Sequence, residues 1–302
     1  MTPLLLGLLA GLLAGPVPRL LVRVTRTRRT PRAAMLLWQG VALAAVLAAL
    51  GAGASLATGT AWRDEPGAAS YVVAGVALLV TGLVLGRLLL SAHLVGTRLR
   101  TLRRRHRDQV DLVAHRFSQR GSTRAGVVVL DHDLPVAYCL PGMQKARVVV
   151  SAGALGRLDA AEVDAVLAHE RAHLRARHDL VLEAFSVLHR AFPRWVSSAA
   201  ALAEVRLLVE VLADRAAVRS AGGGGRRALG RALVELAGAR AAGPGSGVTL
   251  GSGTAGPDLV VRVRLLADTG AHRVQASVLA ALAAAVLAVP TTFVVGPWLT
   301  GL

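Results

Sequence analysis

Long apolar runs alternate with short basic stretches over the first hundred residues, and another apolar run lies at the carboxyl end. Residues 33–62 and 274–302 contain no charged residue, and the run from 67 to 95 is interrupted only by Arg87. An α-helix needs about 20 predominantly apolar residues to cross the hydrocarbon core of a bilayer. The pattern therefore predicts membrane-spanning helices at about 34–58, 68–94 and 274–302.

The first apolar stretch, at about residues 2–22, has two interpretations: a further span or a secretory signal peptide. A signal peptide carries its basic residues ahead of the apolar segment. Here no Lys or Arg precedes the segment, and six Arg lie between residues 19 and 32. Because basic loops stay on the cytoplasmic side, this order predicts a span whose amino end is outside.

A second basic cluster, six Arg between residues 98 and 107, places the region after the third span in the cytoplasm. The loop at 63–65 is short and nearly neutral, as expected for the outer side. The chain is thus predicted to be a multi-pass protein of the bacterial inner (plasma) membrane, embedded in the lipid bilayer. Its predicted parts are a membrane domain over 1–96 with three spans, a cytoplasmic domain over 97–273 and a fourth span over 274–302.

The net charge of +17 raises nucleic-acid binding as an alternative. Twelve Arg lie in the two clusters beside the spans, where membrane topology and anionic headgroups account for them. Aromatic residues, which would stack on bases, make up only 3% of the chain and do not interleave with basic patches. The sequence therefore argues against a nucleic-acid partner.

The predicted cytoplasmic domain contains shorter elements. β-Branched runs bounded by Gly, Asp and Pro predict strands at 126–130 and 146–150, and a weaker one at 135–140. Asp159, with Glu162 three residues later, predicts a capping box at the start of a helix. The fold class is thus a multi-spanning α-helical membrane protein with about four transmembrane helices and a mainly α domain carrying a small β-sheet. Further helices are predicted at 98–117, 180–192, 205–218 and 226–241.

One cluster in this domain can carry out chemistry: His169-Glu170-Arg171-Ala172-His173. Two His at positions i and i+4 lie on one helical face, one turn apart, so both rings can reach the same metal ion. The Glu between them lies close to that face and can take a proton from a metal-bound water. These are the minimal side chains for zinc-dependent hydrolysis of an amide bond.

A pair of carboxylates follows downstream. Glu210 and Asp214 are again at i and i+4, inside the apolar-periodic segment 205–218. One carboxylate can bind zinc, and the other can accept a hydrogen bond from a ligand His and fix its tautomer. Two His, one carboxylate and a water form the open, catalytic type of zinc site. The alternative is a solvated helix face, which the apolar flanks disfavour.

Other zinc geometries can be weighed on spacing alone. A metzincin requires Gly and His three and six residues after the second His, where this chain has Ala176 and Asp179. His178 sits at the wrong helical phase to join the two motif His, which favours a supporting or a surface role over a role as a metal ligand. The single cysteine, Cys139, excludes a thiolate zinc site and an intramolecular disulfide.

Together the two motifs resemble those of the BlaR/MecR-type integral membrane metallopeptidases, over roughly residues 123–240. They are similar, more distantly, to HtpX- and CAAX-prenyl-type membrane peptidases, which share the H-E-x-x-H and E-x-x-A-D pair. The resemblance implies a gluzincin, with a zincin-like domain and one zinc ion (Zn2+) per chain. It implies zinc ligands at His169, His173 and Glu210, a catalytic Glu170 and a supporting Asp214.

The function expected from these residues is zinc-dependent endopeptidase activity on the cytoplasmic side. The resemblance implies cleavage of a BlaI/MecI-type transcriptional repressor; the alternatives are HtpX-like quality control and a catalytically silent scaffold, against which the intact Glu170 argues. BlaR/MecR-type receptors carry a penicillin-binding sensor domain after the last span, whereas this chain ends at Leu302, so a sensor partner protein or the spans are expected to supply the trigger.

An edge strand near Val148 is expected to hold the protein or peptide substrate, unless these strands form a purely structural hairpin. Arg206, Arg177 and His178 are the candidates for stabilising the oxyanion.

Overall fold

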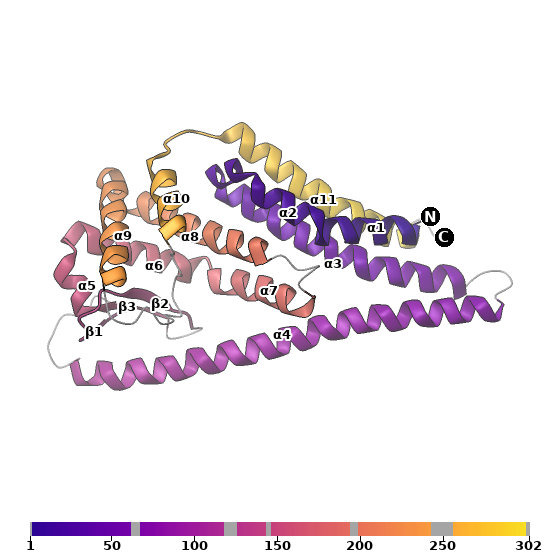
Figure 1. Cartoon of the computed structure of the whole chain (residues 1–302), viewed down its shortest axis with the longest axis horizontal. Coiled ribbons are helices and arrows are strands. Elements are labelled where there is room, and N and C mark those ends of the chain that lie inside the picture. The colour runs from indigo at the N-terminus through magenta and orange to yellow at the C-terminus, as the bar shows by residue number, and fades with distance from the viewer. Residues whose placement is uncertain are drawn as a thin grey trace. The chain divides into compact units, whose positions relative to one another are not determined.

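A computed structural model describes residues 2–61, 67–117, 126–142, 146–193, 199–242 and 256–299. These residues are mainly helical and include a three-stranded sheet (Figure 1). The predicted outer loop at 63–65 lies outside the described residues. Two compact units are present: Met1–Val95, Ala184–Leu208 and Ala271–Leu302 form the first, and Gly96–Glu183 and Val209–Gly270 form the second.

The first unit contains helices that are long and apolar enough to cross a membrane. It includes α1 (Thr2–Ala14), α2 (Pro16–Arg23), α3 (Pro31–Ala61) and α11 (Arg273–Leu299). Figure 1 shows α1, α3 and α11 lying side by side. By length and composition the described chain has four candidate spans, as predicted: Thr2–Arg23, Pro31–Thr60, Ala68–Leu112 and Arg273–Gly296.

Small residues let α3 and α11 approach each other closely. A Cβ atom added at Gly40 would lie 3.1 Å from the backbone oxygen of Ala283. Between helices surrounded by lipid, tight van der Waals packing replaces the hydrophobic driving force. Leu37, Val41 and Leu279 belong to the apolar core at this contact.

The helix α4 (Ala68–Phe117) is unbroken and covers both the predicted third span and the predicted basic helix after it. Within the first unit, α4 contacts the carboxyl end of α7 (His178–Ala191). Arg87 Nε donates to the carbonyl oxygen of Ala191 at 2.9 Å, and the Ser91 hydroxyl donates to that of Val187 at 2.9 Å. The last turn of a helix leaves carbonyls without an intrahelical partner. Arg87, inside an otherwise apolar run, therefore supplies a hydrogen-bond donor to the carboxyl end of α7.

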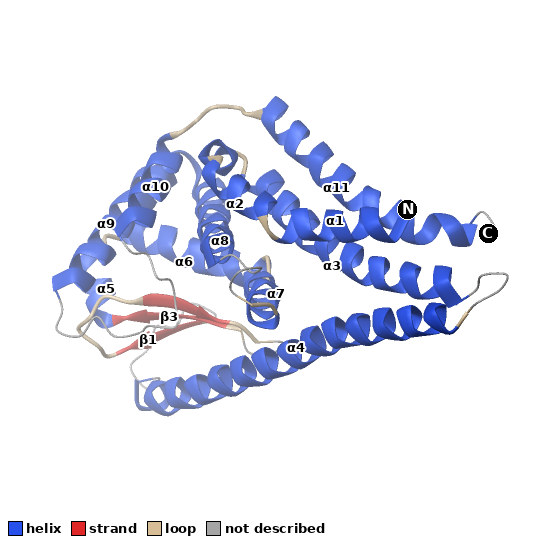
Figure 2. Ribbon diagram, turned by 45° about the vertical axis from the view of Figure 1, so that its right-hand side comes forward, coloured by secondary structure: helices blue, strands red, loops and turns tan. Residues whose placement is uncertain are grey.

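The sheet of the second unit has the strand order β1-β3-β2. β1 (Val127–Leu130) lies parallel to β3 (Arg147–Ser151), and β2 (Ala137–Leu140) lies antiparallel to it. All three predicted strands are present (Figure 2). The prediction that the strand near Val148 lies at an edge of the sheet is wrong. Val148 lies in the central strand, and the edge strand that packs against α6 (Ala160–Arg175) is β2.

Both faces of the sheet are covered, because successive side chains of a strand point to opposite sides. Val148 and Val150 pack with Leu167 of α6 in one apolar cluster. Val149 faces the other way and packs with Val110 of α4. A shift of one residue in the register would exchange the two faces. The alternation therefore fixes which face of the sheet packs against α6.

The metal-motif helix α6 begins where the sequence predicts. The Asp159 carboxylate accepts from the Glu162 backbone N–H at 2.8 Å, and the Glu162 carboxylate accepts from the Asp159 N–H at 3.0 Å. The predicted capping box is thus confirmed. The remaining α-helices of the described residues are α5 (Ala152–Arg157), α8 (Ala199–Ala221), α9 (Gly225–Ala242) and α10 (Gly256–Ala267), of which α5 and α10 were not predicted.

Candidate metal centre

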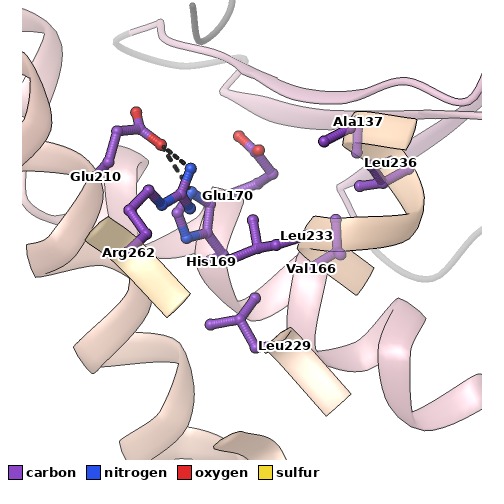
Figure 3. A pocket seen from close by; sticks show the side chains of 10 residues that line it. Ala137, Val166, His169, Glu170, Glu210, Leu229, Leu233, Leu236 and Arg262 are labelled. Carbon is purple, nitrogen blue, oxygen red and sulfur yellow. Dashed lines mark ion pairs between the residues drawn. The ribbon is translucent and has the colours of Figure 1, made fainter. Parts of the chain in front are cut away.

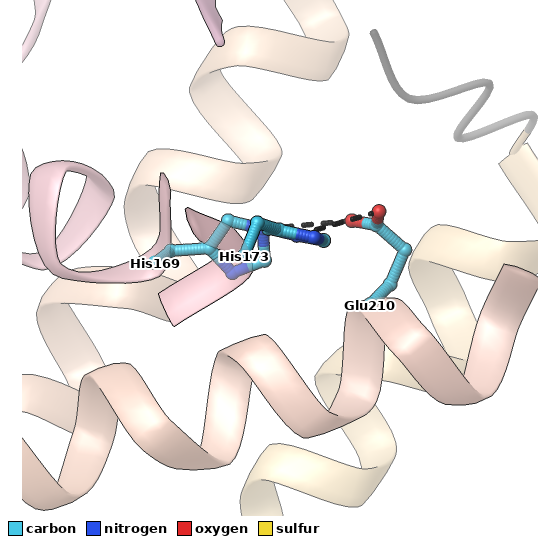
Figure 4. Close-up of side chains that lie close together, drawn as sticks. All are labelled: His169, His173 and Glu210. Atoms are coloured by element: carbon cyan, nitrogen blue, oxygen red, sulfur yellow. Dashed lines mark hydrogen bonds and ion pairs between the residues drawn. The ribbon is translucent and has the colours of Figure 1, made fainter. Parts of the chain in front are cut away.

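Three predicted ligands from two helices converge in the second unit. His169 and His173 lie one turn apart on α6, with their Nε2 atoms 3.1 Å from each other. Glu210 of α8 faces both rings: its Oε2 lies 3.5 Å from His169 Nε2, and its Oε1 lies 3.6 Å from His173 Nε2 (Figure 4). The structure therefore brings together side chains that are about 40 residues apart in the sequence.

The separations between these atoms suit a tetrahedral zinc ion. With zinc–ligand bonds of about 2.0–2.1 Å, two ligand atoms of a tetrahedral site lie about 3.4 Å apart. The two Nε2 atoms lie 3.1 Å apart, and each lies 3.5 or 3.6 Å from one of the two Glu210 oxygens, distances that lie around that value. In the described part of the chain, this is the one group of His, Cys, Asp or Glu side chains whose ligand atoms all lie within 4.8 Å of one another. Two imidazoles and a carboxylate also match the donor atoms that zinc prefers.

A buried ion pair supports two of the three ligands. Asp214, one turn after Glu210 on α8, has its Oδ1 2.8 Å from His169 Nδ1. Arg262 of α10 donates to the two carboxylate oxygens of Asp214 at 2.6 and 2.8 Å. Its Nη1 also lies 3.1 Å from Glu210 Oε2 (Figure 3). One guanidinium, only 2% exposed, thus holds the carboxylates of both Glu210 and Asp214.

Arg262 was missed in the sequence because no helix was predicted between residues 241 and 274, where the structure has α10. The available signal was a single Arg within the apolar run Leu259-Val260-Val261-Arg262-Val263. A charge buried in such a run requires a partner of opposite charge. Of the Arg candidates named above, Arg206 is exposed and Arg177 lies 3.5 Å from Asp179; neither lines the cavity described below.

His178 is buried beside the ligand set, with 6% of its surface exposed. Its Nδ1 lies 3.1 Å from His173 Nδ1, and the two rings meet edge to face with centroids 4.9 Å apart. Of the two roles left open by the spacing, the surface role is wrong. The helical-phase argument assumed a continuous helix, but α6 ends at Arg175.

Glu170 points into a small cavity beside the ligands (Figure 3). The cavity measures about 40 Å³ and is lined by His169, Glu210, Arg262 and apolar side chains of α6, α9 and β2. A single water needs about 10–15 Å³ of such space. Burial raises the pKa of the Glu170 carboxyl, while a hydrogen bond with the thiol of Cys139 on β2 acts in the opposite direction.

The electrostatics of the site favour a divalent cation. Its three carboxylates face one guanidinium, which leaves an excess of negative charge. Burial lowers the pKa of His173 to about 3, so this ring is neutral, as a metal ligand must be. Burial also opposes protonation of His169, but hydrogen bonds to Asp214 and Glu210 prevail and raise its pKa to about 10. A cation between the ligands would replace that proton.

The part of the chain that carries α6 is similar to known proteins. Residues 99–208 match the sequence model of Peptidase family M48. This range contains His169, Glu170 and His173 and ends just before Glu210. Family M48 consists of zinc metallopeptidases, so the match supports a metal-dependent protease.

One relative supports the same family. An 81-residue stretch is 38% identical to "Protease HtpX homolog" from Acidiphilium cryptum (strain JF-5) and covers 26% of this chain. The similarity spans only 27% of that relative. No solved structure matches the chain. Together the similarities support a membrane-type M48 metallopeptidase, and they do not single out the BlaR/MecR type.

Proposed function

We propose that this chain is an integral membrane zinc metalloendopeptidase. One observation carries the proposal: His169 Nε2, His173 Nε2 and the Glu210 carboxylate form a triangle with edges of 3.1–3.6 Å, beside Glu170. Two His and one carboxylate that leave a fourth position for water are typical of catalytic, not structural, zinc sites. The M48 similarity supports the same reaction.

Glu170 is the general base of the proposed reaction. A zinc ion held by the three ligands would lower the pKa of its bound water and polarise the scissile carbonyl. Glu170 accepts the proton of the attacking water and returns it to the leaving amine. Burial suits this role, because it raises the pKa of the Glu170 carboxyl from that of an exposed carboxylate.

Arg262 and Asp214 prepare the ligands in this proposal. Asp214 Oδ1 is placed to accept a hydrogen bond from the Nδ1–H of His169, so that Nε2 keeps its lone pair for the metal. Arg262 engages Glu210 Oε2, which leaves Oε1 for the metal. Because Arg262 also lines the cavity, it replaces Arg206 and Arg177 as the candidate that stabilises the oxyanion.

The edge strand β2 is the proposed docking line for an extended substrate. The Ser151 N–H donates to the Val136 carbonyl oxygen at 2.9 Å, which makes this a hydrogen-bonded pair of the antiparallel ladder. Such pairs alternate with non-hydrogen-bonded ones. Ala137 and Cys139 therefore direct their backbone N–H and C=O groups away from β3. A peptide can pair with these groups as an added strand.

The cavity must widen before a peptide can enter. Its volume of about 40 Å³ is far below the roughly 300–1,000 Å³ of ordinary ligand pockets. Leu229, Leu233 and Leu236 of α9 form part of its wall. We therefore expect substrate binding to displace this wall, so that the described conformation is a closed form of the enzyme.

The zinc-dependent reaction can be tested with the purified chain in detergent and unfolded casein as the substrate. A zinc chelator should abolish cleavage, and stoichiometric zinc added after removal of the chelator should restore it. Magnesium added instead of zinc should not restore cleavage, because Mg²⁺ prefers oxygen ligands to imidazole. Cleavage that continues undiminished in the metal-free protein would contradict the proposal.

For the biological role we propose regulatory cleavage of a small cytosolic repressor of the BlaI/MecI type. The motif resemblance supports it, and the two Arg clusters support a cytoplasmic position for residues 97–273. The alternative is HtpX-like quality control of membrane proteins, which the similarity to the Acidiphilium protease favours. A catalytically silent scaffold is disfavoured, because Glu170 and all three ligands are present.

Deletion of the gene separates the first two roles. Under inducing stress, the deletion strain should retain an uncleaved repressor and silent target genes, as measured by immunoblot and transcript level. Accumulation of misfolded membrane proteins with normal repressor turnover would instead establish the quality-control role.

A further inference from the structure

His178 has a position that the proposed hydrolysis does not use. It is neither one of the three converging ligands nor part of the cavity wall. Yet it is 6% exposed, and its Nδ1 lies 3.1 Å from Nδ1 of His173. The contact is thus made to the ring nitrogen of His173 that faces away from Glu210.

The chain adopts an uncommon backbone conformation to make this contact. On a continuous helix, His178 would point about 140° away from His173, five residues earlier. Instead α6 ends at Arg175, and Arg177 has φ 49°, the one positive φ of a non-glycine residue in the described chain. For a residue with a Cβ atom, this left-handed conformation is sterically disfavoured. Arg177 directly follows the C-cap Ala176, a position at which helices commonly end in this conformation, and the turn brings His178 back beside His173.

The proton arrangement follows from the metal site. If Nε2 of His173 binds the metal, its proton must be on Nδ1. Nδ1–H then donates to Nδ1 of His178, which accepts and carries its own proton on Nε2. We propose that His178 is a positioning residue that fixes the tautomer and ring orientation of the zinc ligand His173. This inference rests on the zinc site proposed above.

The two ligand His thus have different supports. His169 faces the Asp214 carboxylate, whereas His173 faces a neutral imidazole. A carboxylate at position 178 would add a fourth negative charge to a buried site that has one guanidinium. A neutral acceptor orients the second ligand without that cost.

Two amide substitutions test the position of the acceptor atom. In His178→Asn the side-chain oxygen can take the place of imidazole Nδ1, whereas in His178→Gln the longer side chain carries its amide to the place of Nε2. His178→Phe keeps the ring and removes both nitrogens. His189→Phe, the same change farther along α7, is the matched control, because His189 belongs neither to the ligands nor to their supports.

The measurement is the zinc dissociation constant of the full-length chain in detergent, obtained by competition with a chelator. His178→Gln and His178→Phe should weaken zinc binding about 10–100-fold, the usual effect of losing the partner of a ligand His. His178→Asn and the control should stay close to the parent chain. With Co²⁺ in place of zinc, the visible absorption bands should shift in His178→Gln and not in His178→Asn. A role in packing alone would not produce this pattern.

Equal zinc affinities of the parent, Gln and Phe variants would overturn the inference, and so would equal losses in the Asn and Gln variants. If the Phe variant does not fold, the Asn and Gln pair still decides the question. If the parent chain itself does not bind zinc, the proposed function fails. If the parent chain binds zinc and its His178 variants bind it equally tightly, only the inference about His178 fails.

Discussion

At the scale of single residues, Arg262 links the acidic groups of the site. It is paired with Asp214 through two hydrogen bonds and with Glu210 through one oxygen, and it is 2% exposed. Burial opposes its charge, but the hydrogen bonds and the attraction of Asp214 prevail and raise the pKa of Arg262. Removing the guanidinium would take the Arg262 charge away from the carboxylates of Asp214 and Glu210.

Arg262→Met should therefore destabilise the metal-free protein by about 3–5 kcal/mol, the usual cost of breaking a buried ion pair from one side. Thermal unfolding in detergent measures the loss. Arg157→Met is the matched control: Arg157 and Glu235 lie 3.6 Å apart and are about half exposed, so that pair contributes about 0–1 kcal/mol. Equal losses in both variants would contradict the role assigned to Arg262.

The site residues that could be predicted from the sequence are those spaced so that they share one face of a single helix. His169 and His173 are four residues apart on one helix, with Glu170 between them, and Glu210 and Asp214 have the same spacing on a second helix. Arg262 and the contact of His178 depend on α10 and on the turn at Arg177, which no spacing within one helix reveals. Even so, an isolated Arg in an apolar run is a recognisable sign of a buried ion pair.

At the scale of elements, β2 connects the sheet to the site. It forms one edge of the order β1-β3-β2, packs against α6 and carries Cys139. Ala137, its first residue, lines the cavity. An extended substrate paired with this edge would lie next to the general base.

Ala137→Pro should keep the sheet but weaken substrate binding, because a proline at the first residue of a strand is tolerated and removes only the outward N–H. The loss of one hydrogen bond, about 1 kcal/mol, corresponds to about a fivefold decrease in kcat/KM for casein. Ala137→Val adds bulk at the same position and keeps the N–H, so its kcat/KM should exceed that of the Pro variant. If the two variants lose activity equally, β2 does not bind substrate through its backbone.

Local sequence patterns predicted which segments form helices and strands better than they predicted how these segments pair and pack. The capping box of Asp159 and Glu162 correctly predicted the start of α6, and the β-branched runs correctly predicted three strands. The central place of β3 was not predictable, because strand pairing depends on contacts between distant segments. The same limit explains why Val148 was misplaced at an edge.

At the scale of the whole molecule, the distribution of Arg sets the expected topology. The four candidate spans are apolar enough to cross a membrane, and the two Arg clusters are expected to stay inside. Reporter fusions after Arg107 and after Gly247 should both report the cytoplasm, and a fusion at Asp64 should report the exterior. An exterior signal at Gly247 would overturn the four-span arrangement and with it a cytoplasmic substrate.

The most direct test of the central claim combines zinc content and proteolysis in purified Glu170→Gln. This change keeps all three ligands and removes the base, so the variant should retain one zinc per chain and cleave no casein. His173→Ala and Glu210→Ala should instead lose the zinc. Near-normal cleavage by Glu170→Gln would contradict the mechanism.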